Sequence, residues 1–127
     1  MKVLIADDDR QTADCMAEFV RISGHEPVAT VTTGGLDVLH ACDRTMPDLV
    51  LMDVMMPRFN GLTVCHALTS RPVCPKIVFL SGKVEPDHPF ITNAHADAFL
   101  AKPITLEAFR KVMDRIAGQV VPARTVT

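Results

Sequence analysis

Short runs of apolar residues recur along the chain at intervals that leave room for a helix between them. Each run is four or five residues long and shows little alternation with polar residues. Such a run is typical of a strand buried on both faces, as in a parallel sheet. The pattern therefore predicts five strands, at residues 3–6, 28–31, 49–52, 76–80 and 98–101.

The segments between these runs carry apolar residues spaced three and four apart, as on one face of a helix. The clearest stripe runs from Ala13 to Val20, and Gly24 and Pro27 then end the helix. Three further stripes predict three further helices: Leu36, Leu39 and Cys42; Leu62, Cys65 and Leu68; Leu106, Phe109, Met113 and Ile116. Thr105 is the predicted N-cap of the last of these helices.

One more helix is predicted between the fourth and fifth strands. Pro86 and Pro89 leave it little room, so we expect a short helix around residues 87–94. Strands that alternate with helices in this way predict an α/β fold, a doubly wound five-stranded parallel sheet with about five helices on its two faces. Residues 1–117 would form this one domain, and residues 118–127, which carry no stripe, a loose C-terminal tail.

Polar side chains stand where four of the five predicted strands end. Two acids follow the first strand, and the third, fourth and fifth strands each end at one polar residue: Asp7 and Asp8, then Asp53, Ser81 and Lys102. In a doubly wound sheet the ligand site lies outside the carboxyl ends of the strands. We therefore expect these five side chains to converge on one site.

Three carboxylates in one site need a positive partner, because like charges a few ångströms apart repel and raise one another's pKa. A bound divalent cation would supply it. Oxygen ligands with open positions for water and phosphate favour magnesium over zinc, and the cysteines and histidines are not spaced as zinc ligands. The sequence therefore predicts a Mg²⁺ site formed by Asp7, Asp8 and Asp53.

The composition fits one soluble globular domain, with 48% apolar and 22% charged residues in a chain of 127. A net charge of −2 with scattered Lys and Arg argues against nucleic acid or a membrane as the main partner. The chain has neither a signal-peptide core nor an apolar run near the about 18 residues of a membrane span, so we expect it in the cytoplasm. Without a C-x-x-C pair, its cysteines should be reduced and mostly buried: Cys15, Cys42, Cys65 and Cys74.

Four motifs together resemble the receiver domain of two-component response regulators, of the chemotaxis-regulator type. They are the acid pair Asp7-Asp8, the pattern D-x-x-M-P-x-x-x-G from Asp53 to Gly61, the hydroxyl of Ser81 and the pair Lys102-Pro103. The resemblance covers residues 2–117 and implies a flavodoxin-like sheet with strand order 2-1-3-4-5. It also implies a Lys102-Pro103 peptide bond that is commonly cis in the family.

The resemblance implies a phosphoacceptor rather than an enzyme in the usual sense. Asp53 would take a phosphoryl group from a sensor histidine kinase, a phosphotransfer protein or a small phosphodonor. Asp8, Asp53 and the backbone carbonyl of Met55 would bind Mg²⁺ directly, and Asp7 through water. Lys102 would neutralise the transferring phosphoryl group, which is physically reasonable because this chemistry depends mostly on positioning and charge.

The resemblance further implies a switch and a control of phosphate lifetime. Ser81 would donate a hydrogen bond to the phosphoryl group and draw its loop inward, and Phe99 would then turn inward as the switch aromatic. A plain core phenylalanine is an equally good interpretation of Phe99. Met55 and Lys83 would flank the path by which water attacks the phosphoryl group. Because methionine cannot orient that water and a charged lysine cannot accept its proton, self-dephosphorylation should be slow.

In receivers, the fourth helix, fifth strand and fifth helix usually form the face that binds a downstream partner. Here the segment from Ser81 to Lys102 is about one residue shorter than is common, and His95 stands where glycine is usual, so the fourth helix should be short or displaced. Met1 directly before the first strand favours a natural N-terminus. A stand-alone receiver and a part of a longer regulator or hybrid kinase both remain open.

Two other protein classes were compared with the sequence. A haloacid dehalogenase-type phosphohydrolase would use Asp7 as nucleophile and Asp9 as acid/base, but it expects threonine where Gln11 stands and gives Asp53 no role. A flavodoxin-like electron carrier needs a phosphate-binding loop after the first strand, where three consecutive aspartates would repel phosphate. Both interpretations are weaker than the receiver.

Overall fold

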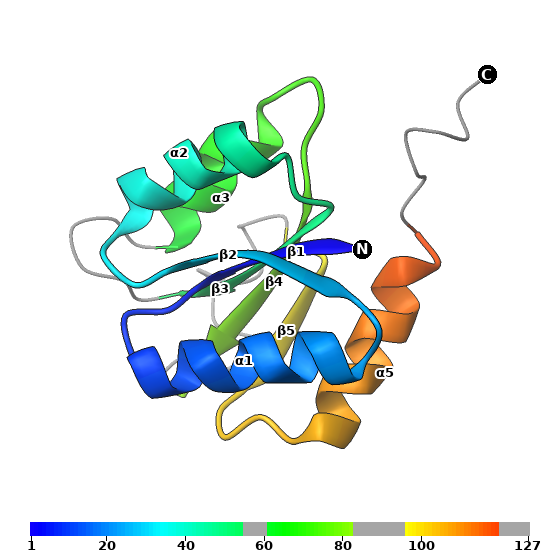
Figure 1. The fold of residues 1–127 in the computed structure, drawn as a ribbon. Coiled ribbons are helices and arrows are strands. Elements are labelled where there is room, and N and C mark those ends of the chain that lie inside the picture. Colours follow the sequence, from blue (N-terminus) through cyan, green and yellow to red (C-terminus); the bar gives the residue numbers. More distant parts are fainter. Residues whose placement is uncertain (55–60, 83–95, 120–127) are drawn as a thin grey trace.

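The computed structural model describes residues 1–54, 61–82 and 96–119. Its centre is one parallel sheet in the order β2-β1-β3-β4-β5 (Figure 1). The predicted fold and strand order are thereby confirmed. The strands are β1 Lys2–Ala6, β2 Glu26–Val31, β3 Leu49–Asp53, β4 Lys76–Ser81 and β5 Ala98–Ala101.

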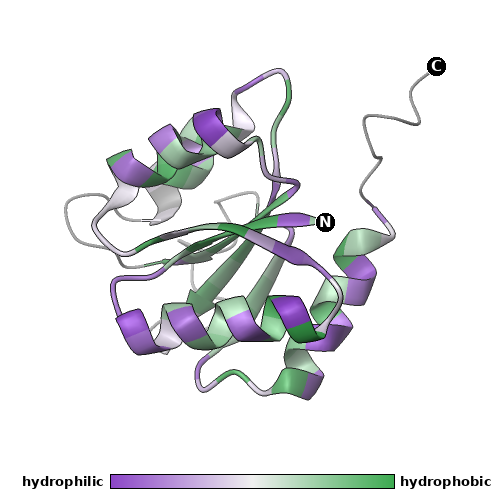
Figure 2. Cartoon of the chain, in the orientation of Figure 1, coloured by the Kyte–Doolittle hydropathy of each residue, from purple (hydrophilic) through white to green (hydrophobic). Residues whose placement is uncertain are grey.

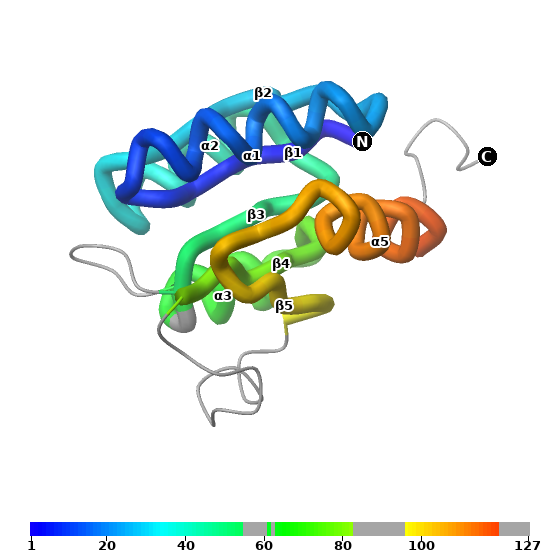
Figure 3. The backbone as a smooth tube through the Cα atoms, turned by 90° about the horizontal axis from the view of Figure 1, so that it is seen from below, coloured from blue at the N-terminus to red at the C-terminus, as the bar shows by residue number. Residues whose placement is uncertain are grey.

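Helices cover both faces of the sheet. In the described part of the chain, α1 (Arg10–Ile22) and α5 (Leu106–Ala117) lie on one face, and α2 (Gly35–Thr45) and α3 (Gly61–Thr69) lie on the other (Figure 1). The view from below shows α1 along β1 and β2, and α5 beside β5 (Figure 3). The predicted short helix around residues 87–94 lies outside the described residues.

The two faces arise from the two-residue period of the strands. In β3, Val50 and Met52 point into the core beneath α2 and α3, and Leu49 and Leu51 point into the core beneath α1 and α5. Both sets are fully buried, which explains why the run is apolar without alternation. The hydropathy colouring shows the matching apolar sides of the helices turned toward the sheet (Figure 2).

The second strand begins earlier than the pattern predicts. It starts at Glu26 rather than Val28, although Pro27 has no N–H to give to a ladder. Because β2 is an edge strand, a proline is tolerated there. The register shifts between Val3 and Leu4 of β1, which pair with Pro27 and Ala29, so Val28 is the extra residue of a bulge.

The predicted buried face of α2 is partly wrong. Leu36 is 54% exposed, and the buried side chains of this helix include Val38, Ala41 and Cys42. Two stripes compete in this helix, and the smaller residues form the one that packs against the sheet. The stripes of α1 and α5 are confirmed, as is the cap of α5, where the Thr105 hydroxyl accepts a hydrogen bond from the Ala108 N–H at 3.1 Å.

The four cysteines form no disulfide, as predicted, but they are not mostly buried. Cys42 and Cys65 lie in the core, whereas Cys15 and Cys74 are exposed. Cys15 belongs to a helical stripe only by spacing, since it lies on the solvent side of α1. Within the described residues, no helix is both long and apolar enough to cross a membrane.

Candidate functional site

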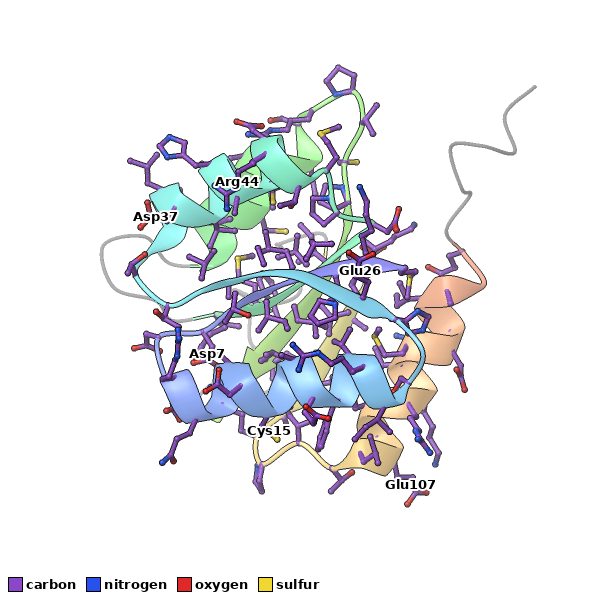
Figure 4. All side chains as sticks on the ribbon, viewed as in Figure 1. Asp7, Cys15, Glu26, Asp37, Arg44 and Glu107 are labelled. Carbon is purple, nitrogen blue, oxygen red and sulfur yellow. The ribbon has the colours of Figure 1, made fainter. Side chains whose placement is uncertain are left out.

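The carboxyl ends of β1 and β3 place two aspartates side by side. Asp53 is the last residue of β3, and Asp7 directly follows β1, whose Ala6 pairs with Met52. The Asp7 N–H donates to the Val31 carbonyl of β2 at 3.0 Å, which extends the ladder to the site. Figure 4 shows Asp7 at the end of the sheet where α1 begins.

Three carboxylates meet at this edge, as the sequence predicts. One oxygen from each of Asp7, Asp8 and Asp53 lies within 4.8 Å of the other two. Asp7 is fully buried and Asp53 is 8% exposed, whereas Asp8 faces solvent. Asp7 and Asp53 therefore form the buried part of the cluster, and Asp8 forms its solvent-exposed side.

Lys102 brings a positive charge into the same cluster. Its Nζ lies 3.0 Å from Asp53 Oδ2, to which it donates a hydrogen bond, and 2.7 Å from Asp7 Oδ2. Partial burial by itself would lower the pKa of Lys102, but its contacts with Asp7 and Asp53 outweigh that effect and raise the pKa. The ammonium thus stays charged at neutral pH and bridges the two buried acids.

The backbone around Lys102 ties the fifth strand to the fourth. The Lys102 N–H donates to the Ser81 carbonyl at 2.8 Å, and the peptide bond from Lys102 to Pro103 is cis, as the resemblance implies. Ser81 ends β4 and is 3% exposed. The structure thus brings together four of the predicted side chains, those of Asp7, Asp8, Asp53 and Lys102. For Ser81 it shows the backbone link to Lys102, and the convergence of its hydroxyl stays a prediction.

The carboxylates fit a divalent cation. Asp7 Oδ2 is buried, and the contact found for it among the described residues is the Lys102 ammonium at 2.7 Å. A carboxylate oxygen has two lone pairs, so one such contact leaves capacity for a metal ion or for metal-bound water. Oxygen ligands of this kind suit Mg²⁺ rather than a softer metal.

Asp9 has a local role that the sequence analysis did not assign. Its side chain accepts hydrogen bonds from the Gln11 N–H at 3.2 Å and the Thr12 hydroxyl at 2.8 Å, and thereby caps α1. The bond from Thr12 is the main reason why the pKa of Asp9 is lowered. The Asp9 N–H also donates to Asp7 Oδ1 at 2.9 Å, so this cap fixes one oxygen of the cluster. An acid directly before a helical stripe was the available signal.

Phe99 lies on β5 opposite Phe79 of β4. Its side chain is partly buried and packs against the core beneath α2 and α3. This burial fits both predicted interpretations, a core phenylalanine and a switch aromatic. Its predicted turning motion stays a prediction. Met55 and Lys83, the residues predicted to tune phosphate lifetime, lie outside the described residues.

A groove of about 1420 Å³ lies at the opposite end of the sheet. Its lining includes Lys2, Asp48 and Lys76, which stand at the amino ends of the strands. None of the predicted site residues that the structure describes borders it. Chemistry that depends on the buried acids and Lys102 is therefore confined to the carboxyl ends.

The geometry of the carboxyl ends suits a group with several negative oxygens. A carboxylate oxygen of Asp53 can attack as a nucleophile, with Lys102 beside it to neutralise incoming charge, and a divalent cation, if held by the three acids, would add to that neutralisation. The arrangement is thus better suited to acyl phosphate formation on an aspartate than to acid/base hydrolysis.

Comparison with known proteins gives a consistent result. Residues 3–114 match the family model of the response regulator receiver domain. The sensory transduction protein RegX3 of Mycobacterium tuberculosis is 37% identical over 101 residues, which are 80% of this chain and 44% of RegX3. The response regulator MprA of Mycobacterium leprae is 32% identical over 108 residues, 84% of this chain and 46% of MprA. The matched segment covers less than half the length of each of these two relatives.

Solved structures have the same fold. The receiver domain of a histidine kinase from Syntrophus aciditrophicus superposes with a TM-score of 0.84 at 22% identity, over 99% of this chain and 96% of that one. A response regulator receiver domain from Methylobacillus flagellatus superposes with a TM-score of 0.80 at 25% identity, over 91% of this chain and 98% of that one.

Proposed function

The chain belongs to the family of response regulator receiver domains, and from that membership we propose that Asp53 is its phosphoacceptor. In the transfer, an Asp53 carboxylate oxygen bonds to phosphorus while the P–N bond of a phosphohistidine breaks, and the bonding pair stays on the imidazole nitrogen. The donor is a sensor histidine kinase or a phosphotransfer protein. Acetyl phosphate or phosphoramidate would serve as a small donor in the same way.

The observation that carries this proposal is the bridge that Lys102 makes between Asp53 and Asp7, at 3.0 and 2.7 Å. Asp53 therefore lies beside the Lys102 ammonium, whose positive charge can stabilise the phosphoryl group during its transfer. The haloacid dehalogenase alternative gives Asp53 no role, whereas the contact of Asp53 with Lys102 at 3.0 Å supports a role for it.

We assign Asp8, Asp53 and the Met55 backbone carbonyl as direct Mg²⁺ ligands and Asp7 as a ligand through water. When bound, Mg²⁺ would neutralise phosphoryl oxygens during the transfer. The three carboxylates, with one oxygen of each within 4.8 Å of the other two, support this assignment. Lys102 would then hold the phosphoryl oxygens by charge.

We further propose that phosphorylation acts through Ser81 and Phe99. The Ser81 hydroxyl would donate a hydrogen bond to the phosphoryl group, and Phe99 would turn inward. The face that changes would comprise β5, α5 and the segment predicted as a fourth helix, and a downstream protein would bind there. Ser81 is almost completely buried, so its side chain has little room to move. Phe99 is only partly buried, so its ring has room to turn.

The experiment incubates the protein with phosphoramidate and Mg²⁺ and follows intact mass. One phosphoryl group should be added, and chelation with EDTA should prevent it. Asp53→Asn should abolish the addition, whereas the exposed Asp114→Asn on α5 serves as a matched control and should react like the parent. Full labelling of Asp53→Asn would move the acceptor elsewhere and refute the proposal.

The lifetime of the acyl phosphate forms a separate proposal. Met55 cannot orient water, and a charged Lys83 cannot accept a proton from it, so self-dephosphorylation should be slow. Replacing Met55 by Asn together with Lys83 by Glu should accelerate phosphate loss, followed by intact mass after donor removal at fixed Mg²⁺. An unchanged rate would show that these positions do not control water attack.

A further inference from the structure

Gly61 lies unusually close to the end of β3. A Cβ built on this buried glycine would stand 2.7 Å from the Asp53 carbonyl oxygen and 2.9 Å from Val54 Cα. Cβ atoms are essentially never found that close to a backbone atom. The start of α3 can therefore lie against the strand end only because residue 61 has no side chain.

The Asp53–Val54 backbone is held from two directions. On one side the Val54 N–H donates to the Leu80 carbonyl of β4 at 3.1 Å, and on the other the Gly61 N–H donates to the Val54 carbonyl at 2.5 Å. The chain thus fixes the backbone that carries the Asp53 side chain between β4 and the first turn of α3. That side chain must in turn meet Lys102 at 3.0 Å.

Three other glycines, Gly24, Gly82 and Gly118, lack this close approach. A Cβ at Gly118 would come no nearer than 3.5 Å to any backbone atom, which is an ordinary contact, and one at Gly24 would meet nothing within 4 Å. The crowding at Gly61, against the strand end that bears Asp53, is therefore not shared by these three glycines.

We propose that Gly61 is a positioning residue for phosphoryl transfer: its missing side chain lets α3 set the backbone of Asp53, and thereby the distance from the Asp53 carboxylate to Lys102 and to the acids of β1. This inference rests on the proposed function. An added methyl group must displace the Asp53–Val54 peptide by several tenths of an ångström, and reacting groups need placement within about 0.5 Å.

The test is Gly61→Ala, measured against the parent and against Gly118→Ala as a matched glycine-to-alanine control. We expect Gly61→Ala to fold, and its maximal rate of phosphorylation by phosphoramidate, at saturating donor and Mg²⁺, to fall about tenfold or more. The rate is expressed per folded molecule, with the folded fraction taken from circular dichroism. Gly118→Ala should keep the parental rate.

A second measurement separates positioning from simple loss of stability. Mg²⁺ titration followed by NMR should show weaker binding to folded Gly61→Ala, because Asp53 shifts relative to Asp7 and Asp8, while a change of stability alone would leave binding to the folded protein intact. A parental rate and parental Mg²⁺ affinity would overturn the proposal. A wholly unfolded Gly61→Ala would also overturn it, since the glycine would then serve the fold as a whole. If instead the parent itself takes no phosphate on Asp53, the proposed function fails first.

Discussion

At the scale of single residues, the cluster is governed by the charge of Lys102. One ammonium stands between two buried carboxylates, within 2.7 and 3.0 Å of an oxygen of each. Such a cation lowers the repulsion between the acids, but it also competes for the same oxygens with any divalent cation. Its contributions to metal binding and to phosphoryl transfer should therefore have opposite signs.

Lys102→Met is predicted to bind Mg²⁺ more tightly and to accept phosphate more slowly. Without the positive charge, the acids should attract the metal ion more strongly. The substitution also removes the ammonium that stabilises the transferring phosphoryl group, so the rate of phosphorylation should fall by about 100-fold or more. Calorimetry and intact-mass kinetics measure the two effects. Lys111→Met, which removes an exposed lysine paired with Glu107 on α5, is the control and should change neither. Weaker Mg²⁺ binding by Lys102→Met would contradict the charge argument.

At the scale of elements, the caps decide where helices begin. Thr105 accepts a hydrogen bond from Ala108 at the start of α5, and Asp9 does the same for α1. Because α5 follows the loop from Lys102, its cap fixes the element that leaves the site.

Thr105→Ala is predicted to lower the free energy of unfolding by about 1 kcal/mol, since one N–H of the first turn loses its acceptor. Thr105→Ser keeps a hydroxyl and should recover most of this loss. Urea denaturation, with an unchanged dependence on urea concentration, measures both. Equal destabilisation by alanine and serine would show that the hydroxyl does not cap the helix.

Sequence patterns predict these elements well where one face is strongly apolar. The strands near Asp53 and the stripes of α1 and α5 are of this kind, and so are the polar strand ends, because parallel strands must end together. The patterns fail where two faces compete, as at Leu36, or where tertiary context overrides propensity, as at Pro27 on an edge strand. The close packing of Gly61 against Asp53 could not be predicted either, because it depends on a distance between two elements.

At the scale of the whole molecule, the reactivity of the buried thiols reports whether the core beneath α2 and α3 is closed. Burial raises the pKa of Cys42 and of Cys65 to about 11, and the side chains are enclosed. Thiols with such a pKa are thiolate in only about one part in a thousand at pH 8. Cys15 and Cys74 are exposed.

We predict that native protein at pH 8 reacts rapidly with iodoacetamide at Cys15 and Cys74 and only slowly at Cys42 and Cys65. In denaturant all four should react at similar rates. Peptide mass spectrometry after timed quenching distinguishes the sites. Fast alkylation of Cys42 or Cys65 in the native protein would mean that the core beneath α2 and α3, to which both thiols belong, opens readily.

The central claim is that the phosphoryl group resides on Asp53. Borohydride reduces an aspartyl phosphate to homoserine and leaves an ordinary aspartate unchanged, so reduction after phosphorylation marks the acceptor permanently. Peptide sequencing by mass spectrometry then reads the position in the unaltered chain. The account predicts homoserine at position 53 alone, present with Mg²⁺ and absent with EDTA. Homoserine at position 7, 8 or 9 with an unmodified Asp53 would contradict it.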